Sequence, residues 1–137
     1  MTQDLLVGAV LVTHGRLGQE FVAVAQTIVG ELSHIVAVSI GLNDDVEESK
    51  KRIEEAVQKV NQGKGVIILT DMFGGTPSNL SLPLLQRNEV EIITGVNLPM
   101  VIKLVNQSGN DSLLELVTKV TEQGRKHISI SSELLGE

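Results

Sequence analysis

LLVGAVLV, residues 5–12, is the segment that indicates the fold class most clearly. It is a continuous apolar run with β-branched residues, stopped by Gly15, which is the pattern of a strand buried on both faces. Such strands are typical of parallel sheets covered by helices on either side. The run is too short to span a bilayer, lacks a basic leader and ends in Thr-His-Gly, so it predicts a core strand and no membrane or targeting segment.

Strand patterns and helix patterns alternate along the rest of the chain. The predicted strands are residues 5–12, 35–40, 66–69 and 90–94, with a short alternating strand at 127–131. The predicted helices are residues 17–32, 46–60, Thr76 or Pro77 to about Gln86, a helix from Met100, and about 112–123. This alternation implies right-handed crossovers. We therefore expect a doubly wound, mainly parallel four-stranded α/β sheet flanked by helices.

The first two helices show clear apolar faces. Helix 17–32 carries an apolar stripe made of Phe21, Val24, Ile28 and Leu32. Helix 46–60 shows a shared face made of Ile53, Ala56, Val57 and Val60. Each spacing predicts that one side of the helix packs against the sheet. Asp44 or Asp45 precedes the second helix and suits its N-cap.

Composition limits the classes of function. The 137 residues fit one domain, 1–137, and the two Phe with no Trp or Tyr leave a core of Val, Ile and Leu. The net charge of −6 argues against nucleic acid and anionic membrane as partners. Without cysteine, the chain has no disulfide, thiolate catalysis or Cys-ligated metal. We expect a soluble, cytoplasmic protein.

The loops after the first and third strands are where a ligand site is expected. In open α/β sheets this site lies beyond the carboxyl ends of the strands, where the strand order reverses. These loops contain His14 and Asp71, which should lie within hydrogen-bond reach if the two strands are neighbours. A carboxylate on one imidazole nitrogen fixes the ring and leaves the other nitrogen free as a nucleophile or base.

The same loops could bind a phosphoryl group. Backbone N–H groups from Gly15 onward and from the turn Gly74-Gly75-Thr76 are arranged as anion-binding sites often are. The hydroxyls of Thr13 and Thr76 could also donate. Glycine suits these positions because a side chain would keep the backbone away from the phosphate oxygens.

Each residue also has a purely structural interpretation. A histidine after a strand is more often a loop residue than a catalyst, and Asp71 alone would be a plausible cap or turn residue. Their joint placement at the two loops favours function. For His34 and His127 we expect structural roles. Arg16 either contacts phosphate or a partner, or is a solvated residue of the first helical turn.

Three separated motifs now point to a family. Residues 12–15 (Val-Thr-His-Gly), 71–79 (Asp-Met-Phe-Gly-Gly-Thr-Pro-Ser-Asn) and 95–100 (Gly-Val-Asn-Leu-Pro-Met) resemble the mannose-class IIA domains, of mannose, fructose and sorbose type, of the bacterial phosphoenolpyruvate-dependent sugar phosphotransferase system. The resemblance extends from the first strand to about residue 105. The last thirty or so residues match no motif.

The resemblance implies a phosphotransferase component for sugar transport. His14 would take a phosphoryl group from the phosphocarrier protein HPr and pass it to a IIB component, which serves the membrane IIC and IID subunits. It also implies that Asp71 hydrogen-bonds the imidazole and that Gly74-Gly75-Thr76 lies against the phosphoryl group. Neither a metal nor a cofactor is implied. The implied state is a homodimer with an exchanged C-terminal antiparallel strand, for which residues 127–131 are the candidate.

Two other functions fit the same residues. In one, a free-standing regulatory IIA-like protein carries the phosphorylated histidine and a partner reads it, with no sugar transport downstream. In the other, the glycine loops hold a soluble phosphate ligand without a covalent step. A subunit of the dihydroxyacetone kinase system shares the general fold, but residues 95–100 fit the sugar class better. Since no second histidine-bearing domain follows, we expect a free-standing subunit.

Overall fold

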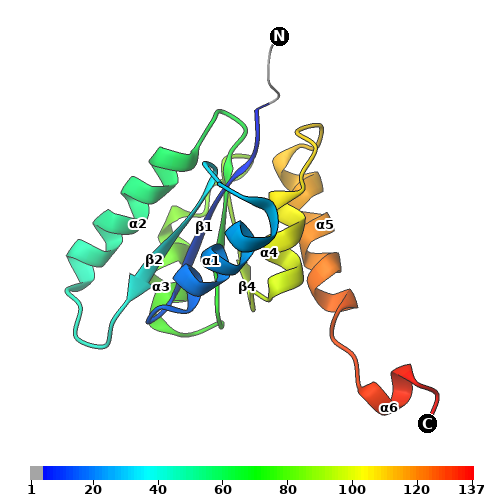
Figure 1. Cartoon of the computed structure of the whole chain (residues 1–137). Coiled ribbons are helices and arrows are strands. Elements are labelled where there is room, and N and C mark those ends of the chain that lie inside the picture. The colour runs from blue at the N-terminus through cyan, green and yellow to red at the C-terminus, as the bar shows by residue number, and fades with distance from the viewer. Residues whose placement is uncertain (1–4) are drawn as a thin grey trace.

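Four parallel strands form the centre of the molecule (Figure 1). They are β1 (Gly8–His14), β2 (Ile35–Ile40), β3 (Val66–Thr70) and β4 (Val90–Thr94), in the spatial order β2-β1-β3-β4. The computed structural model describes residues 5–137. The prediction of an α/β fold with a four-stranded parallel sheet flanked by helices is confirmed.

The strand order places the switch point between β1 and β3. β1 runs beside β2 on one side, with His14 level with Ile40, and beside β3 on the other, with Val12 level with Thr70. The loops after all three strands therefore open at the same edge of the sheet. This is the edge at which a ligand site is expected in such folds.

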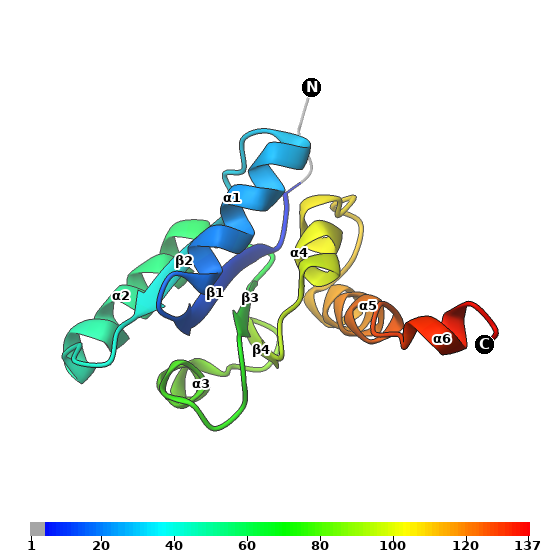
Figure 2. The same cartoon turned by 60° about the horizontal axis from the view of Figure 1, so that its bottom comes forward.

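Helices cover both faces of the sheet (Figure 2). They are α1 (Leu17–Val29), α2 (Val46–Val60), α3 (Thr76–Ser81) with the 3-10 turn η1 (Leu82–Leu84), α4 (Leu98–Val105), α5 (Leu113–Lys126) and the short α6 (Ser131–Leu134). Helices α1, α4 and α5 pack on one face, and α2 and α3 on the other. Among residues 5–137, no helix has the length and apolar character needed to cross a membrane.

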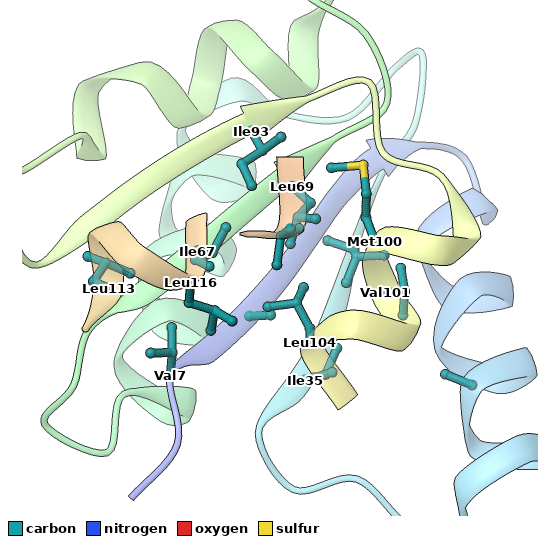
Figure 3. Packing of buried hydrophobic residues seen from close by; sticks show 14 residues of the cluster. Val7, Ile35, Ile67, Leu69, Ile93, Met100, Val101, Leu104, Leu113 and Leu116 are labelled. Carbon is teal, nitrogen blue, oxygen red and sulfur yellow. The ribbon is translucent and has the colours of Figure 1, made fainter. Parts of the chain in front are cut away.

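The core follows the alternation of side chains along the strands. In β1, Ala9 and Leu11 face α1, α4 and α5, whereas Val10 and Val12 face α2 and α3. All four are fully buried. Figure 3 shows the first of these two clusters, in which Leu104 from α4 and Leu116 from α5 approach strand residues such as Ile67 and Leu69. The double burial explains why the run is unbroken from Val7 to Val12, whereas Leu5 is half exposed.

The predicted apolar stripe of α1 is partly wrong. Val24 and Ile28 are 43% and 59% exposed, whereas Ala25 is fully buried. The helix approaches the sheet through small residues: a Cβ added to Gly18 would lie 3.1 Å from the Thr13 hydroxyl. Periodicity counts large apolar residues as core, so it misplaces a face built from glycine and alanine. The helix also ends at Val29, earlier than predicted.

Other boundaries differ by a few residues for local reasons. β1 begins at Gly8 and continues to His14, and α3 begins at Thr76 but ends at Ser81, before Pro83 interrupts it. Helix α4 starts at Leu98, two residues before the predicted Met100, because the Asn97 side chain accepts from the Met100 N–H as an N-cap. The predicted bounds of β2, α2 and β4 agree with the structure.

The predicted C-terminal strand is not seen. Residues 127–130 have no regular structure, and Ser131–Leu134 form α6, which stands away from the body in both views (Figures 1 and 2). Ile128 and Ile130 are 76% and 62% exposed. An extended segment becomes a strand only where a neighbouring strand accepts its hydrogen bonds. Among residues 5–137, this segment has no such neighbour.

Candidate functional site

His14 ends β1, and Asp71 directly follows β3. One carboxylate oxygen of Asp71, Oδ2, accepts from the His14 backbone N–H at 2.9 Å and lies 2.8 Å from its ring Nδ1. The two residues therefore meet across the switch point, as the placement of their loops predicts. The bond to Nδ1 directs the other ring nitrogen, Nε2, away from Asp71, and the His14 side chain is 49% exposed.

The hydrogen bonds from His14 stabilise the charged form of Asp71. Burial alone would raise the pKa of the Asp71 carboxyl. The hydrogen bonds from the His14 N–H and ring, together with the ring charge, outweigh burial and hold this pKa below its ordinary value. Asp71 is thus an anion over the physiological pH range, and it favours a ring whose Nδ1 carries a proton.

The loop after β3 lies against the other edge of the imidazole. A Cβ added to Gly75 would lie 2.7 Å from Cε1 and 3.2 Å from Nε2 of His14. Only a residue without a side chain allows this approach. Gly74 has a φ of 87°, which also favours glycine, and Thr76 lines the cavity that His14 faces. Gly75 therefore lies against the His14 ring, and Thr76 shares its cavity, whereas Gly74 shapes the turn between Asp71 and these two residues.

Thr13 and Gly15 are placed differently from the other predicted phosphoryl-binding residues. Thr13 is fully buried, and its hydroxyl accepts from the Gly18 N–H at 2.7 Å. The Gly15 N–H donates to the Ile40 carbonyl at 3.0 Å. Both groups therefore stabilise the turn between β1 and α1: the Thr13 hydroxyl is buried beneath the turn, and the Gly15 N–H already has an acceptor.

A cavity of about 520 Å³, here called the His14 cavity, opens beside the imidazole. Its lining residues are His14, Gly15, Ile40, Gly41, Leu42, Asp44, Val46, Ser49, Thr76 and Leu80. Sequence reasoning missed the part of this wall that follows β2. The signal was available, because β2 flanks β1 and its carboxyl end opens at the same edge of the sheet.

Exposed apolar side chains occur in the loops that follow β2 and β3. Met72 and Phe73, which follow Asp71, are 56% and 73% exposed, and Leu42 on the rim of the His14 cavity is fully exposed. Phe73 is one of only two aromatic residues in the chain. Clustered exposed apolar groups are typical of surfaces that bind other proteins.

The remaining candidates lie elsewhere. His34 is buried, which lowers its pKa, and its ring Nε2 faces the Leu104 carbonyl at 3.4 Å. The exposed His127 pairs with the Gln123 carbonyl. Arg16 is exposed and lies 3.7 Å from Glu20. Within residues 5–137, no group of three or more His, Asp or Glu side chains is arranged to hold a metal ion.

Known proteins resemble this chain over most of its length. The mannose-specific EIIAB component of Escherichia coli (strain K12) is 27% identical over 126 residues, covering 90% of this chain and 39% of that protein. The chain thus spans about two fifths of that relative's length. The sorbose-specific EIIA component of Lacticaseibacillus casei is 26% identical over 110 residues, covering 80% of this chain and 79% of that protein.

A solved structure and a family model extend the match. The mannose/sorbose specific IIA subunit from Enterococcus faecalis has a TM-score of 0.78 and 26% identity, covering 91% of this chain and 94% of that one. The family model described as "PTS system fructose IIA component" matches residues 8–121, which is most of the chain. The chain therefore belongs to the mannose, fructose and sorbose family of EIIA domains, the phosphotransferase components of the phosphoenolpyruvate-dependent sugar phosphotransferase system (PTS).

Proposed function

We propose that the chain is a phosphohistidine carrier that accepts a phosphoryl group from HPr on Nε2 of His14. The observation that best supports this is the pairing of Nδ1 with Asp71, which leaves Nε2 free beside the His14 cavity. An imidazole fixed in this way presents its lone pair on Nε2. The exposed apolar side chains of Met72 and Phe73 offer a surface for protein partners.

The transfer needs no metal or cofactor from the protein. The Nε2 lone pair attacks the phosphorus of the donor's phosphohistidine, the new N–P bond forms as the donor's N–P bond breaks, and the donor imidazole leaves. Asp71 stabilises the positive charge that develops on the His14 ring. The onward step to a IIB component repeats this exchange, with His14 as the leaving group.

Backbone N–H groups would stabilise the phosphoryl oxygens. Gly75 and Thr76 follow Asp71 in the loop that touches Nε2, so their N–H groups are the nearest candidates. Thr76 also lines the same cavity, so its hydroxyl is a further candidate donor. Donors held in place before the reaction stabilise developing charge without reorganisation.

We further propose that the carrier serves sugar uptake, in the cytoplasm, as a homodimer. The IIB component would pass the phosphoryl group to sugar that enters through membrane IIC and IID subunits. The names of the relatives, which refer to mannose and sorbose, support a hexose-type substrate. The exposed Ile128 and Ile130 support exchange of the C-terminal segment between subunits, because a partner's sheet edge would give them a neighbour.

Intact-mass analysis tests the carrier function. The wild-type chain is incubated with phosphoenolpyruvate, enzyme I and HPr, in parallel with His14→Ala. We expect an acid-labile gain of one phosphoryl group in the wild type and none in the variant. The variant should keep its fold, because an exposed residue at a strand end contributes little to stability.

The destination of the phosphoryl group is tested by adding IIB. Loss of the added mass from the chain and its gain by IIB would support the uptake role. A stable phosphorylated chain in the presence of IIB would favour the regulatory alternative. Absence of any mass gain in the wild type would contradict the carrier function itself.

A further inference from the structure

β2 also holds the turn that follows His14. The Gly15 N–H donates to the Ile40 carbonyl, and the Gly15 carbonyl accepts from the hydroxyl of Ser39. Both the N–H and the carbonyl of Gly15 are thus hydrogen-bonded to β2. Gly15 has a φ of 52°, so the chain reverses here from β1 into α1. The function proposed above gives no role to Ser39.

The bond from Ser39 fixes the orientation of the Gly15–Arg16 peptide. In a planar trans peptide, the carbonyl and the following N–H point in opposite directions. Because Ser39 draws the Gly15 carbonyl toward β2, the Arg16 N–H is turned away from β2. On the other side of β1 lies β3, whose loop contacts the His14 ring. Among residues 5–137, the Arg16 N–H finds no hydrogen-bond acceptor.

We propose that Ser39 is a positioning residue for phosphoryl transfer, because its hydroxyl aims the Arg16 N–H at the phosphoryl group on His14. This inference rests on the carrier function proposed above. The Arg16 N–H would approach the phosphoryl oxygens from the β1 turn, whereas Gly75 and Thr76 approach them from the β3 loop. The Gly15 N–H cannot donate to the phosphoryl group because it is bonded to the Ile40 carbonyl, so the Arg16 N–H would be the donor from this turn.

Ser39 is itself held from α2. The guanidinium of Arg52 donates to the Ser39 carbonyl and lies 3.9 Å from the Asp44 carboxylate. Asp44 in turn accepts from the Gly41 N–H at 2.7 Å. These contacts fix the end of β2, which is an edge strand of the sheet formed by the described residues. The Ser39 hydroxyl is therefore presented to the turn by a supported strand end.

The test compares Ser39→Ala with Ser39→Thr. Alanine removes the hydroxyl, whereas threonine keeps it and suits a strand. The matched control is Thr27→Val, which removes a hydroxyl that donates to the Ala23 carbonyl at 3.0 Å, on the exposed part of α1. Each protein is phosphorylated by HPr, to measure the transfer rate and the dissociation constant for HPr. Each is also phosphorylated by phosphoramidate, a small phosphodonor, for amide NMR.

Phosphorylation of the wild type should shift the Arg16 amide proton downfield, as expected for a hydrogen bond to a phosphoryl oxygen. Ser39→Ala should lose this shift and transfer about tenfold more slowly at unchanged affinity for HPr, since one donor is misdirected and not removed. Ser39→Thr and Thr27→Val should behave as the wild type.

An Arg16 amide that does not respond to phosphorylation of the wild type would overturn the proposal. So would a full transfer rate in Ser39→Ala. Phosphorylation by phosphoramidate does not require HPr, so it tests the role of Ser39 separately from the carrier function. If HPr fails to phosphorylate the wild type, the carrier function is contradicted, and the amide response to phosphoramidate still decides the role of Ser39.

Discussion

At the scale of the residue, the chemistry of the site depends on one oxygen atom. Oδ2 of Asp71 accepts a hydrogen bond from the backbone N–H of His14 and pairs with Nδ1 of its ring. The backbone bond fixes where the residue lies, and the ring bond fixes which nitrogen is exposed. The same two bonds lower the pKa of the carboxyl, although burial acts in the opposite direction. Position, tautomer and charge are therefore set together.

Asp71→Asn should slow phosphoryl transfer by about 10- to 100-fold without abolishing it, the range typical when a residue that orients a metal-bound histidine is changed. The nucleophile remains in this variant, but its orientation and charge stabilisation are weakened. Quench-flow transfer from HPr measures the rate. A rate equal to that of the wild type would remove Asp71 from the mechanism.

The lowered pKa of Asp71 also predicts how stability depends on pH. A carboxyl with a depressed native pKa stabilises the fold fully above its ordinary pKa of 3.8, and this contribution is lost as the pH falls through the native value. The difference in unfolding free energy between the wild type and Asp71→Asn should therefore be larger at pH 7 than near pH 3. Urea unfolding at the two pH values measures it. An equal difference at both would contradict the assigned cause.

At the scale of the element, the site is made by loops that rigid strands bring to one edge. The sequence predicts the bounds of β2 and β4 well, because a turn-forming glycine, Gly41 or Gly95, directly follows each strand. It predicts less well where packing uses small residues, as in α1, where Gly18 and Ala25 face the core and Val24 does not. Hydrophobic periodicity detects large apolar side chains, so it does not identify a helix face that packs through glycine and alanine.

Gly75→Ala tests the close packing of the β3 loop on the imidazole. The backbone at Gly75 has φ −82° and ψ 169°, which alanine adopts without strain, so the fold should keep its stability. The new Cβ would lie 2.7 Å from Cε1 of His14, so the ring must move away from Asp71. We expect transfer to fall by about tenfold or more, since misplacement of a reactive group by about 1 Å can cost 100-fold. A normal transfer rate at unchanged stability would contradict this prediction, because it would mean that the β3 loop moves and the His14 ring stays in place.

At the scale of the whole molecule, part of the chain faces solvent without an evident reason. Ile128, Ile130, Leu134 and Leu135 are each more than half exposed, on a segment that stands away from the body. The sequence predicted a strand here from alternation alone. A strand also needs a partner, and periodicity carries no information about whether the partner lies in the same chain. The site lay within reach of sequence reasoning because both of its loops belong to one chain.

Truncation after Lys126 tests the proposed exchange of the C-terminal segment. If this segment joins two subunits, the full chain should be dimeric and the truncated chain monomeric at micromolar concentration, as measured by light scattering during gel filtration. The truncated chain should unfold cooperatively, because the buried core residues all lie before residue 121. A truncated chain that remains dimeric would place the interface elsewhere.

The central claim is that Asp71, by occupying Nδ1, makes Nε2 of His14 the phosphoryl acceptor. The most direct measurement is NMR of the chain labelled with nitrogen-15 in its histidine rings and phosphorylated through HPr, because phosphorus–nitrogen coupling identifies the bonded nitrogen. The account predicts a phosphoryl group on Nε2 of His14, with the proton retained on Nδ1. A phosphoryl group on Nδ1, or on His34 or His127, would contradict it.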